Sequence, residues 1–220
     1  MSVITISREF GSEGDTIAQK AAQDLDFHFV DKKFIGHILG EYGFVEFDKE
    51  YDTLPGFWER FDAQRGKQRE EIIKMLNQVV QATAHHGNVV ILGRSGFEVL
   101  SGFADVLHIR IQAPLAVRIG RVMEKQNLSF EQAEAVVKEK DRVRLAFVEE
   151  FYKVPWGSMK AFDLVVSTDK ISPEMAETWV VQAMQTYLPE DARTLTASIK
   201  IDRIMADAVS EALACQKIHR

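Results

Sequence analysis

The chain has 220 residues, 46% hydrophobic and 27% charged, which is ordinary for a globular protein and enough for one sizeable domain. Its formal net charge of −6 argues against a general binder of nucleic acid or membrane surfaces. The single cysteine, Cys215, excludes a disulfide framework and a cysteine-based zinc site. Because no apolar run reaches the length of a membrane span and no apolar N-terminal signal is present, we expect a cytoplasmic protein.

Short apolar runs alternate with longer stretches of helical periodicity, which predicts an α/β fold with a mainly parallel sheet. The runs are rich in β-branched and aromatic residues, as in strands covered on both faces. Strands are predicted at residues 3–7, 27–31, 88–93, 106–111 and 162–167. Helices are predicted at residues 16–25, 63–86, 114–126, 130–152 and 173–187. Ser129 with Gln132 indicates a capping box, and Ser172 before Pro173 indicates a second helix start.

Two regions depart from this alternation. Residues 40–62 are aromatic and irregular, which predicts an insertion between the second strand and the long helix. Its aromatic side chains could stack on a base, although such clusters more often form a small local core or a dimer contact. Beyond Leu188 a polar linker leads to a short amphipathic helix at about 202–217. The oligomeric state stays open, with a homodimer as one arrangement.

The first strand runs into the turn ISREFGSEGDTIAQ, residues 6–19, and a helix is expected to begin near Asp15. This is the layout of a phosphate-binding loop, in which backbone N–H groups at a helix N-terminus bind an anion. Gly11, Ser12 and Gly14 supply the turn, and Thr16 supplies a hydroxyl that would reach Mg²⁺.

The loop lacks the lysine of the standard motif and carries Glu13 and Asp15 instead. Arg8, at the end of the strand, is the nearest cation. An ordinary strand–turn–helix with Asp15 as the helix cap therefore remains an equal alternative on the loop alone. A dinucleotide-binding unit with Asp31 as the ribose acid is disfavoured, because the glycine spacing is wrong.

Arginines elsewhere favour an anion site. Arg94 follows a buried strand in ILGRSG, at the sheet edge where ligands of open α/β sheets bind. Arg118 and Arg121 are three residues apart and share one helix face. Arg142 and Arg144 follow on the next helix, where a lid over a nucleotide would lie.

These motifs, in order, resemble the cytidylate kinase-like family of the P-loop nucleoside monophosphate kinases. The resemblance covers roughly residues 1–187 and rests on ITISREFGSEGDTIAQKAA, FHFVDKKFI, VVILGRSG, residues 107–152 and FDLVVSTDKIS. The family opens with a similar turn that already lacks the standard lysine. The resemblance implies a three-layer α/β P-loop nucleotide kinase fold with a parallel five-stranded sheet. It implies a kinase domain at 1–187, with an acceptor-binding insertion at about 40–62 and a lid helix region at about 118–155, followed by a linker and C-terminal helix at 188–220.

The resemblance also implies roles for individual residues. The residues implied to bind ATP are Gly11, Ser12, Glu13, Gly14, Asp15 and Thr16, with Thr16 also on Mg²⁺. Those implied to bind the acceptor are Asp31, Arg94 and Asp141, and those implied in catalysis are Arg8, Arg118, Arg121, Arg142 and Arg144. The implied reaction is transfer of the ATP γ-phosphoryl group to a nucleoside monophosphate, most plainly CMP or dCMP. A catalytically weak nucleotide-binding regulatory module and a kinase for another small acceptor remain alternatives. Nucleotides are the expected partners, without nucleic acid or membrane.

Overall fold

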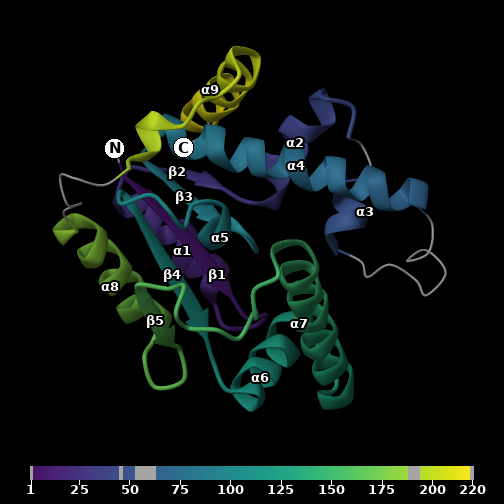
Figure 1. Cartoon of the computed structure of the whole chain (residues 1–220). Helices are drawn as coiled ribbons and strands as arrows, with labels where there is room; N and C mark the ends of the chain where they lie inside the picture. The colour runs from purple at the N-terminus through teal and green to yellow at the C-terminus, as the bar shows by residue number, and fades with distance from the viewer. Residues whose placement is uncertain (1, 45–46, 53–62, 188–193, 219–220) are drawn as a thin grey trace.

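The computed structural model describes residues 2–44, 47–52, 63–187 and 194–218. Its centre is one five-stranded sheet of parallel strands in the order β2-β3-β1-β4-β5 (Figure 1). The strands are β1 (Val3–Arg8), β2 (His28–Val30), β3 (Val89–Leu92), β4 (Val106–Gln112) and β5 (Leu164–Ser167). The predicted parallel sheet is confirmed, and all five predicted strands are present.

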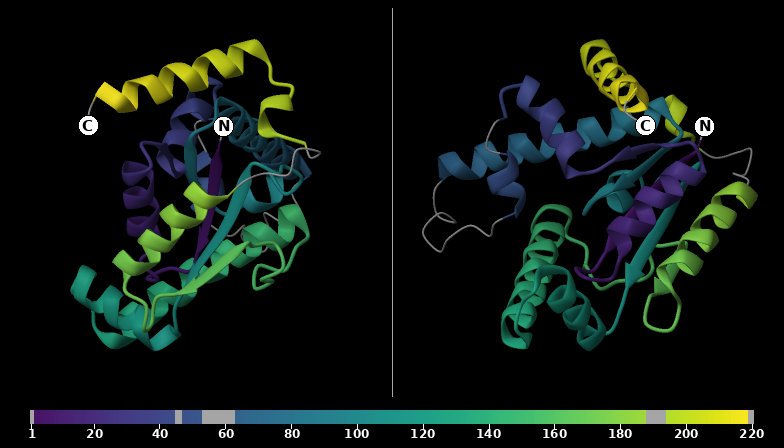
Figure 2. Two further views of the ribbon diagram at one scale, coloured as in Figure 1. Left: turned by 90° about the vertical axis from the view of Figure 1, so that its left-hand side faces the viewer. Right: turned by 180° about the vertical axis from the view of Figure 1, so that it is seen from behind.

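Helices cover both faces of the sheet and make three layers (Figure 2). α1 (Gly14–Asp24) and α8 (Pro173–Thr186) pack on the face that carries Ile4, Ile6 and Ile109. α4 (Ala63–His86) and α5 (Gly96–Val99) lie on the other face, with Val3 and Ile91. Alternate residues of β1 therefore enter different cores, and the strand is buried on both sides.

The region after β2 contains two short helices, α2 (Lys32–Glu41) and α3 (Phe47–Asp52). The sequence analysis does not predict α2, although its apolar residues recur at helical spacing and bury Phe34, Ile35, Ile38 and Leu39. Within the predicted insertion, the side chains of Phe47 and Tyr51 are buried in the core beneath α4. The aromatic residues Phe57, Trp58 and Phe61 lie outside the described residues.

α6 (Leu115–Gln126) and α7 (Phe130–Tyr152) form a helical hairpin at the carboxyl end of β4. The capping box is confirmed, because the Ser129 hydroxyl accepts from Gln132 N and the Gln132 side chain accepts from Ser129 N. A small core of Ile119, Val122, Ala133 and Val137 joins the two helices, and Phe10 packs against it. This hairpin occupies the region predicted as a lid and, through Phe10, contacts the turn that follows β1.

The C-terminal segment, with a 3₁₀ turn η2 (Thr196–Ser198) and α9 (Arg203–Ile218), packs on α4. Asp105 anchors it, because its carboxylate accepts from Thr196 N at 2.8 Å and from the Thr196 hydroxyl at 2.6 Å. Gln216 Nε2 donates to Phe29 O at 3.0 Å, which ties α9 to the outer strand β2. In the part of the chain that the structure describes, no helix has both the length and the apolar character needed to cross a bilayer.

The buried histidine of β4 gives a test of this fold. His108 lies 2.7 Å from the Thr5 hydroxyl, and burial lowers the pKa of His108 below 6.5 despite the nearby charge of Asp163. As the pH falls below about 6.5, His108 binds a proton in the unfolded chain but stays neutral in the folded chain. The free energy of unfolding therefore falls. Urea unfolding from pH 7.5 to 5.5 should show this loss, and His108→Gln should reduce its slope. His37→Gln, at an exposed site, should keep the wild-type slope; an equally steep slope in His108→Gln contradicts the assignment.

Candidate functional site

Residues 9–13 form the turn between β1 and α1. Residues 9–16, which are this turn and the first three residues of α1, are called the phosphate loop. Ser12 is fully buried, and its hydroxyl lies 2.9 Å from Glu9 O and 3.3 Å from Ile111 O. Gly11 has a φ of 79°, a conformation that favours glycine. Glu13 is the N-cap of α1 with a φ of 65° and makes no side-chain capping bond. The first backbone N–H groups of α1 are thus left at the edge of the sheet, as in an anion site.

Gly14 lets α1 begin directly against β1. A Cβ atom at this position would lie 2.6 Å from the Cβ of Arg8, closer than atoms pack. Arg8 reaches across to Asp15, with Nη2 at 2.9 Å from Oδ1. Burial alone would raise the pKa of Asp15, but the charge and hydrogen bond of Arg8 outweigh burial and hold it below its usual value. Asp15 is therefore the counterion of Arg8, in the first turn of α1, rather than the helix cap.

Thr16, the predicted magnesium ligand, hydrogen-bonds to an acidic neighbour. Its hydroxyl lies 3.1 Å from Glu13 Oε2, so hydroxyl and carboxylate oxygens lie together at the mouth of the loop. Among the described residues no cluster of three or more metal-ligating side chains exists. A hydroxyl with one carboxylate fits Mg²⁺, which usually takes one or two protein oxygens and completes its shell with phosphate and water.

The α6–α7 hairpin contacts the phosphate loop through a cluster of buried and half-buried charged side chains. Asp141 on α7 accepts from Phe10 N at 2.9 Å and pairs with Arg118 on α6. Arg118 also donates to Phe10 O at 3.1 Å and to Ala113 O at 2.9 Å, and its Nε lies 3.4 Å from the Glu9 carboxylate. The predicted residues Arg118 and Asp141 therefore meet beneath the loop, where they position its backbone.

Glu9 and Arg110 belong to the same cluster, and the sequence analysis does not identify either. Arg110 is 2% exposed, stacks its guanidinium 4.5 Å from the Trp156 ring, and lies 3.8 Å from the Glu9 carboxylate. Glu9 also accepts from Ala113 N at 3.1 Å. An arginine inside the strand sequence VLHIRI, which is apolar apart from this residue and His108, is the sequence signal that points to this buried pair.

Arg121 ties the loop to the end of β5. Its Nη1 donates to the Thr168 hydroxyl at 2.9 Å, and its Nη2 donates to Thr168 O. The Thr168 hydroxyl in turn donates to Ser12 O at 2.8 Å. Arg118 and Arg121 thus share a helix face, as their spacing predicts, and that face contacts the backbone of the loop.

Arg144 and Arg142, both predicted lid residues, lie in different surroundings. Arg144 is buried over the Phe10 ring at 5.4 Å, and Asp141 lies 3.4 Å away. Burial, with the charges of Arg8 and Arg94, lowers the pKa of Arg144 to about 10. Arg142 is exposed and pairs with Glu139 at 2.8 Å on its own helix. The structure therefore brings Arg144 to the loop and leaves Arg142 on the outer face of α7.

Arg94 follows β3 at the same edge and is buried. Its Nη1 donates to Tyr51 O, and its Nη2 lies 3.1 Å from Asp52 Oδ1. Burial lowers the pKa of Arg94, and the charge of Arg8 adds to this effect. Asp31, a second of the three residues predicted to bind the acceptor, caps α2 by accepting from Lys33 N and Phe34 N; the third, Asp141, lies beneath the phosphate loop.

A hollow of about 260 Å³ opens beside the loop, between α1, α6 and α7. Its lining residues are Phe10, Gly11, Glu13, Asp15, Thr16, Arg121, Val122, Lys125, Gln126 and Arg144. The Nε atoms of Arg144 and Arg8 are buried without a hydrogen-bond partner among the described residues. Unsatisfied guanidinium donors beside a helix N-terminus fit a phosphate group.

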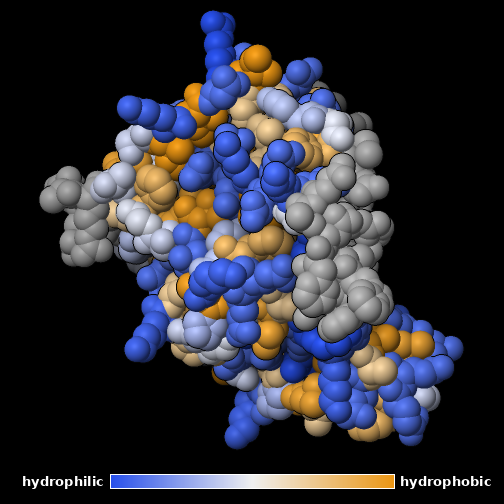
Figure 3. All heavy atoms as spheres, turned by 45° about the vertical axis from the view of Figure 1, so that its right-hand side comes forward, coloured by the Kyte–Doolittle hydropathy of each residue, from blue (hydrophilic) through white to orange (hydrophobic). Residues whose placement is uncertain are grey.

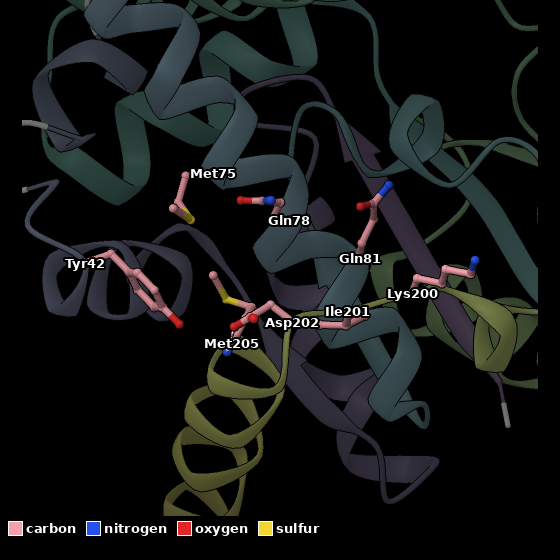
Figure 4. A pocket seen from close by; sticks show the side chains of 8 residues that line it. All are labelled: Tyr42, Met75, Gln78, Gln81, Lys200, Ile201, Asp202 and Met205. Atoms are coloured by element: carbon pink, nitrogen blue, oxygen red, sulfur yellow. Dashed lines mark hydrogen bonds between the residues drawn. The ribbon is translucent and has the colours of Figure 1, made fainter.

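A second hollow of about 260 Å³ lies between the end of α2, α4 and the start of α9 (Figure 4). Two methionines, Met75 and Met205, line it together with polar residues such as Gln78 and Lys200. None of its lining residues belongs to the phosphate loop or to the hairpin. It is therefore separate from the arginine site.

The model of the cytidylate kinase-like family matches residues 3–170. The chain belongs to the cytidylate kinase-like family. The matched stretch contains the phosphate loop, Arg94 and the whole α6–α7 hairpin, and α8 and α9 lie beyond it.

Individual relatives agree with this membership. The chain is 28% identical over 177 residues to a cytidylate kinase of Ignicoccus hospitalis, covering 79% of this chain and 94% of that protein. It is 27% identical over 175 residues to a cytidylate kinase of Pyrobaculum calidifontis, covering 78% and 86%. A crystal structure of an uncharacterized protein from Eubacterium ventriosum superposes with a TM-score of 0.66 at 19% identity, over 84% of this chain and 99% of that one. With the parallel sheet order, these findings confirm the predicted α/β P-loop kinase fold.

The close contact of Gly14 with Arg8 predicts that adding one methyl group at Gly14 destabilises the fold. Gly14→Ala should push Arg8 and the start of α1 apart and lower the free energy of unfolding by about 1–3 kcal/mol. Gly120→Ala, within α6 and with no atom near the added Cβ, is the matched control and should gain about 0.5–1 kcal/mol. Urea denaturation measures both changes; equal effects of the two substitutions would refute a tight contact at Gly14.

The buried cluster predicts a larger effect at Asp141. Asp141→Asn leaves Arg118 and Arg144 without their shared charge partner, so we expect a loss of about 3 kcal/mol in unfolding free energy. Asp207→Asn, which breaks an exposed pair with Arg203 on α9, should leave the unfolding midpoint unchanged. Chemical denaturation measures the free energy of unfolding of both variants. A value for Asp141→Asn close to that of the wild type would mean that the cluster does not hold the loop.

Proposed function

We propose that this protein is a phosphotransferase that moves the γ-phosphoryl group of ATP to a nucleoside monophosphate, with CMP or dCMP as the favoured acceptor. The observation that carries the proposal is the meeting of Arg8, Arg94 and Arg144 at the carboxyl edge of the sheet. The charges of Arg8 and Arg94 lower the pKa of Arg144, and Arg8 lowers that of Arg94. Such like charges gathered beside a helix N-terminus fit a ligand with several phosphates.

In this proposal the phosphate loop binds the donor. The N–H groups at the start of α1 hold the ATP phosphates, Arg144 lies over the loop, and Glu13 with Thr16 offers oxygens to Mg²⁺. The metal would supply charge neutralisation at the transferring group. Arg118, Asp141 and Arg121 fix the loop backbone and act as positioning residues.

The acceptor would lie on the other side of Arg8, toward α2 and α3. Arg94 is the residue proposed for its phosphate, because guanidinium groups bind phosphate through two parallel hydrogen bonds. Asp31 caps α2 at the same edge, beside this position along the sheet. Transfer needs the two phosphates in line, shielded from water, with arginines near the migrating charge. The proposed role of Arg142 would require its side chain to leave Glu139.

One observation favours a second candidate, a nucleotide-binding regulatory module. The loop has no lysine, and the Thr16 hydroxyl already bonds to Glu13. Binding of ATP to such a module would raise the melting temperature of the protein, and no ADP would form.

A coupled assay of ADP formation tests the proposal. With ATP–Mg²⁺ and a panel of CMP, dCMP, UMP, AMP and GMP, we expect turnover of a pyrimidine monophosphate. Arg94→Ala should lower kcat/KM by a factor equivalent to a loss of about 2–5 kcal/mol in transition-state stabilisation, the scale of a buried charged contact. Arg203→Ala, at an exposed position on α9, should keep wild-type kinetics. Unchanged kinetics of Arg94→Ala would remove the acceptor assignment. Absence of turnover across the panel, with ATP still raising the melting temperature, would favour the regulatory module.

A further inference from the structure

The two terminal nitrogens of Arg94 both donate to α3. Nη1 binds Tyr51 O and Nη2 binds Asp52, so the guanidinium closes the C-terminal end of this helix. The same guanidinium lies 4.0 Å from the Tyr51 ring and 5.5 Å from the Phe147 ring. A phosphate could accept the two N–H bonds that Tyr51 O and Asp52 now accept only if the end of α3 moved away.

Asp52 bridges two cations. Its Oδ1 lies 3.1 Å from Arg94 and its Oδ2 lies 2.6 Å from Lys32. Burial alone would raise the pKa of Asp52, but the hydrogen bond from Lys32 and the charges of Lys32, Arg94 and Lys140 outweigh burial and lower it. A carboxylate whose two oxygens each contact a different cation has the arrangement that a bound phosphate would have.

The Asp52 carboxylate and a phosphate monoester differ in charge. Asp52 carries one negative charge and contacts two cations, Lys32 and Arg94. A phosphate monoester carries close to two negative charges at pH 7. It would therefore bind these cations more strongly than a carboxylate does.

We infer that Asp52 is a specificity-determining residue. Its carboxylate competes with the ligand for Lys32 and Arg94, and a doubly charged phosphate monoester displaces it from these two cations. The inference rests on the proposed assignment of Arg94 to the acceptor phosphate. At the two N–H groups that Tyr51 O and Asp52 now accept, binding of α3 and binding of phosphate compete, so each weakens the other by the same factor. Singly charged carboxylate ligands gain nothing by replacing Asp52.

In Figure 3, hydrophilic and hydrophobic residues are mixed over the face turned toward the viewer, and several hydrophobic ones gather toward the top. Phe47 and Tyr51, in contrast, are buried in the core. Their rings lie 5.1 Å apart, and the Tyr51 ring lies 5.1 Å from that of Phe147 on α7. The apolar contacts of α3 and the Asp52 bridge therefore both hold α3 in place. The binding free energy of the ligand must exceed the loss of both.

Isothermal titration with inorganic phosphate at pH 7.5 tests the competition without relying on turnover. Asp52→Asn keeps the shape of the side chain and removes its charge, so it should bind phosphate about tenfold more tightly than the wild type. Asp207→Asn is the matched control and should bind as the wild type does. Acetate should not bind measurably to any of the three proteins. Equal or weaker phosphate binding by Asp52→Asn overturns the inference.

Hydrogen exchange of the wild-type protein gives a second readout that does not depend on the variant folding. Phosphate should speed amide exchange in Phe47–Asp52, whereas a ligand that leaves α3 in place would slow it or leave it unchanged. Either of those last results contradicts the displacement of α3. Arg94→Ala should show fast exchange in α3 before any phosphate is added.

The outcomes also separate this inference from the kinase proposal. Tighter phosphate binding by Asp52→Asn without turnover of any nucleotide would support the competitor and remove the kinase assignment. Turnover that depends on Arg94, with unchanged phosphate affinity in Asp52→Asn, would support the kinase and remove the competitor. A gain in phosphate affinity from Asp52→Asn that persists when Arg94 is also changed to Ala would remove the assignment of Arg94 on which both rest.

Discussion

The site depends on the carboxylate of Asp141. This group, on α7, accepts from the backbone of the phosphate loop at Phe10 and pairs with Arg118 and Arg144 on the two helices of the hairpin. A buried charge is tolerated only when its partners are in place, so loop, α6 and α7 form one electrostatic unit. The loop therefore takes its shape from residues far along the chain as well as from its own glycines.

Much of the architecture follows from local patterns. The five strands are short, β-branched runs, and the helix starts at Ser129 and Ser172 carry recognisable caps, so both are predictable from neighbouring residues. α2 escapes prediction because Gly36 and Gly40 lower its helix propensity, while the buried face that stabilises it depends on tertiary contacts.

The site is predictable in its residue types and less so in their partners. The spacing of Arg118 and Arg121 indicates a shared face, but only the fold shows that this face binds loop carbonyls. Glu9 and Arg110 pair because β1 and β4 are neighbours in register, which no local pattern reveals. The contact of Arg94 with Asp52 likewise depends on where α3 packs, and this is set by Phe47 and Tyr51 in the core.

The attachment of α9 to β2 makes the two edges of the sheet unequal. β2 is an outer strand, and the outward carbonyl of Phe29 is already bonded to Gln216. Edge strands commonly accept a further strand from a peptide or a second chain. At β2 such strand addition would first have to remove α9 from the core residues that Met205 and Val209 contact. A strand added at β5, the other outer strand, would not have to displace α9.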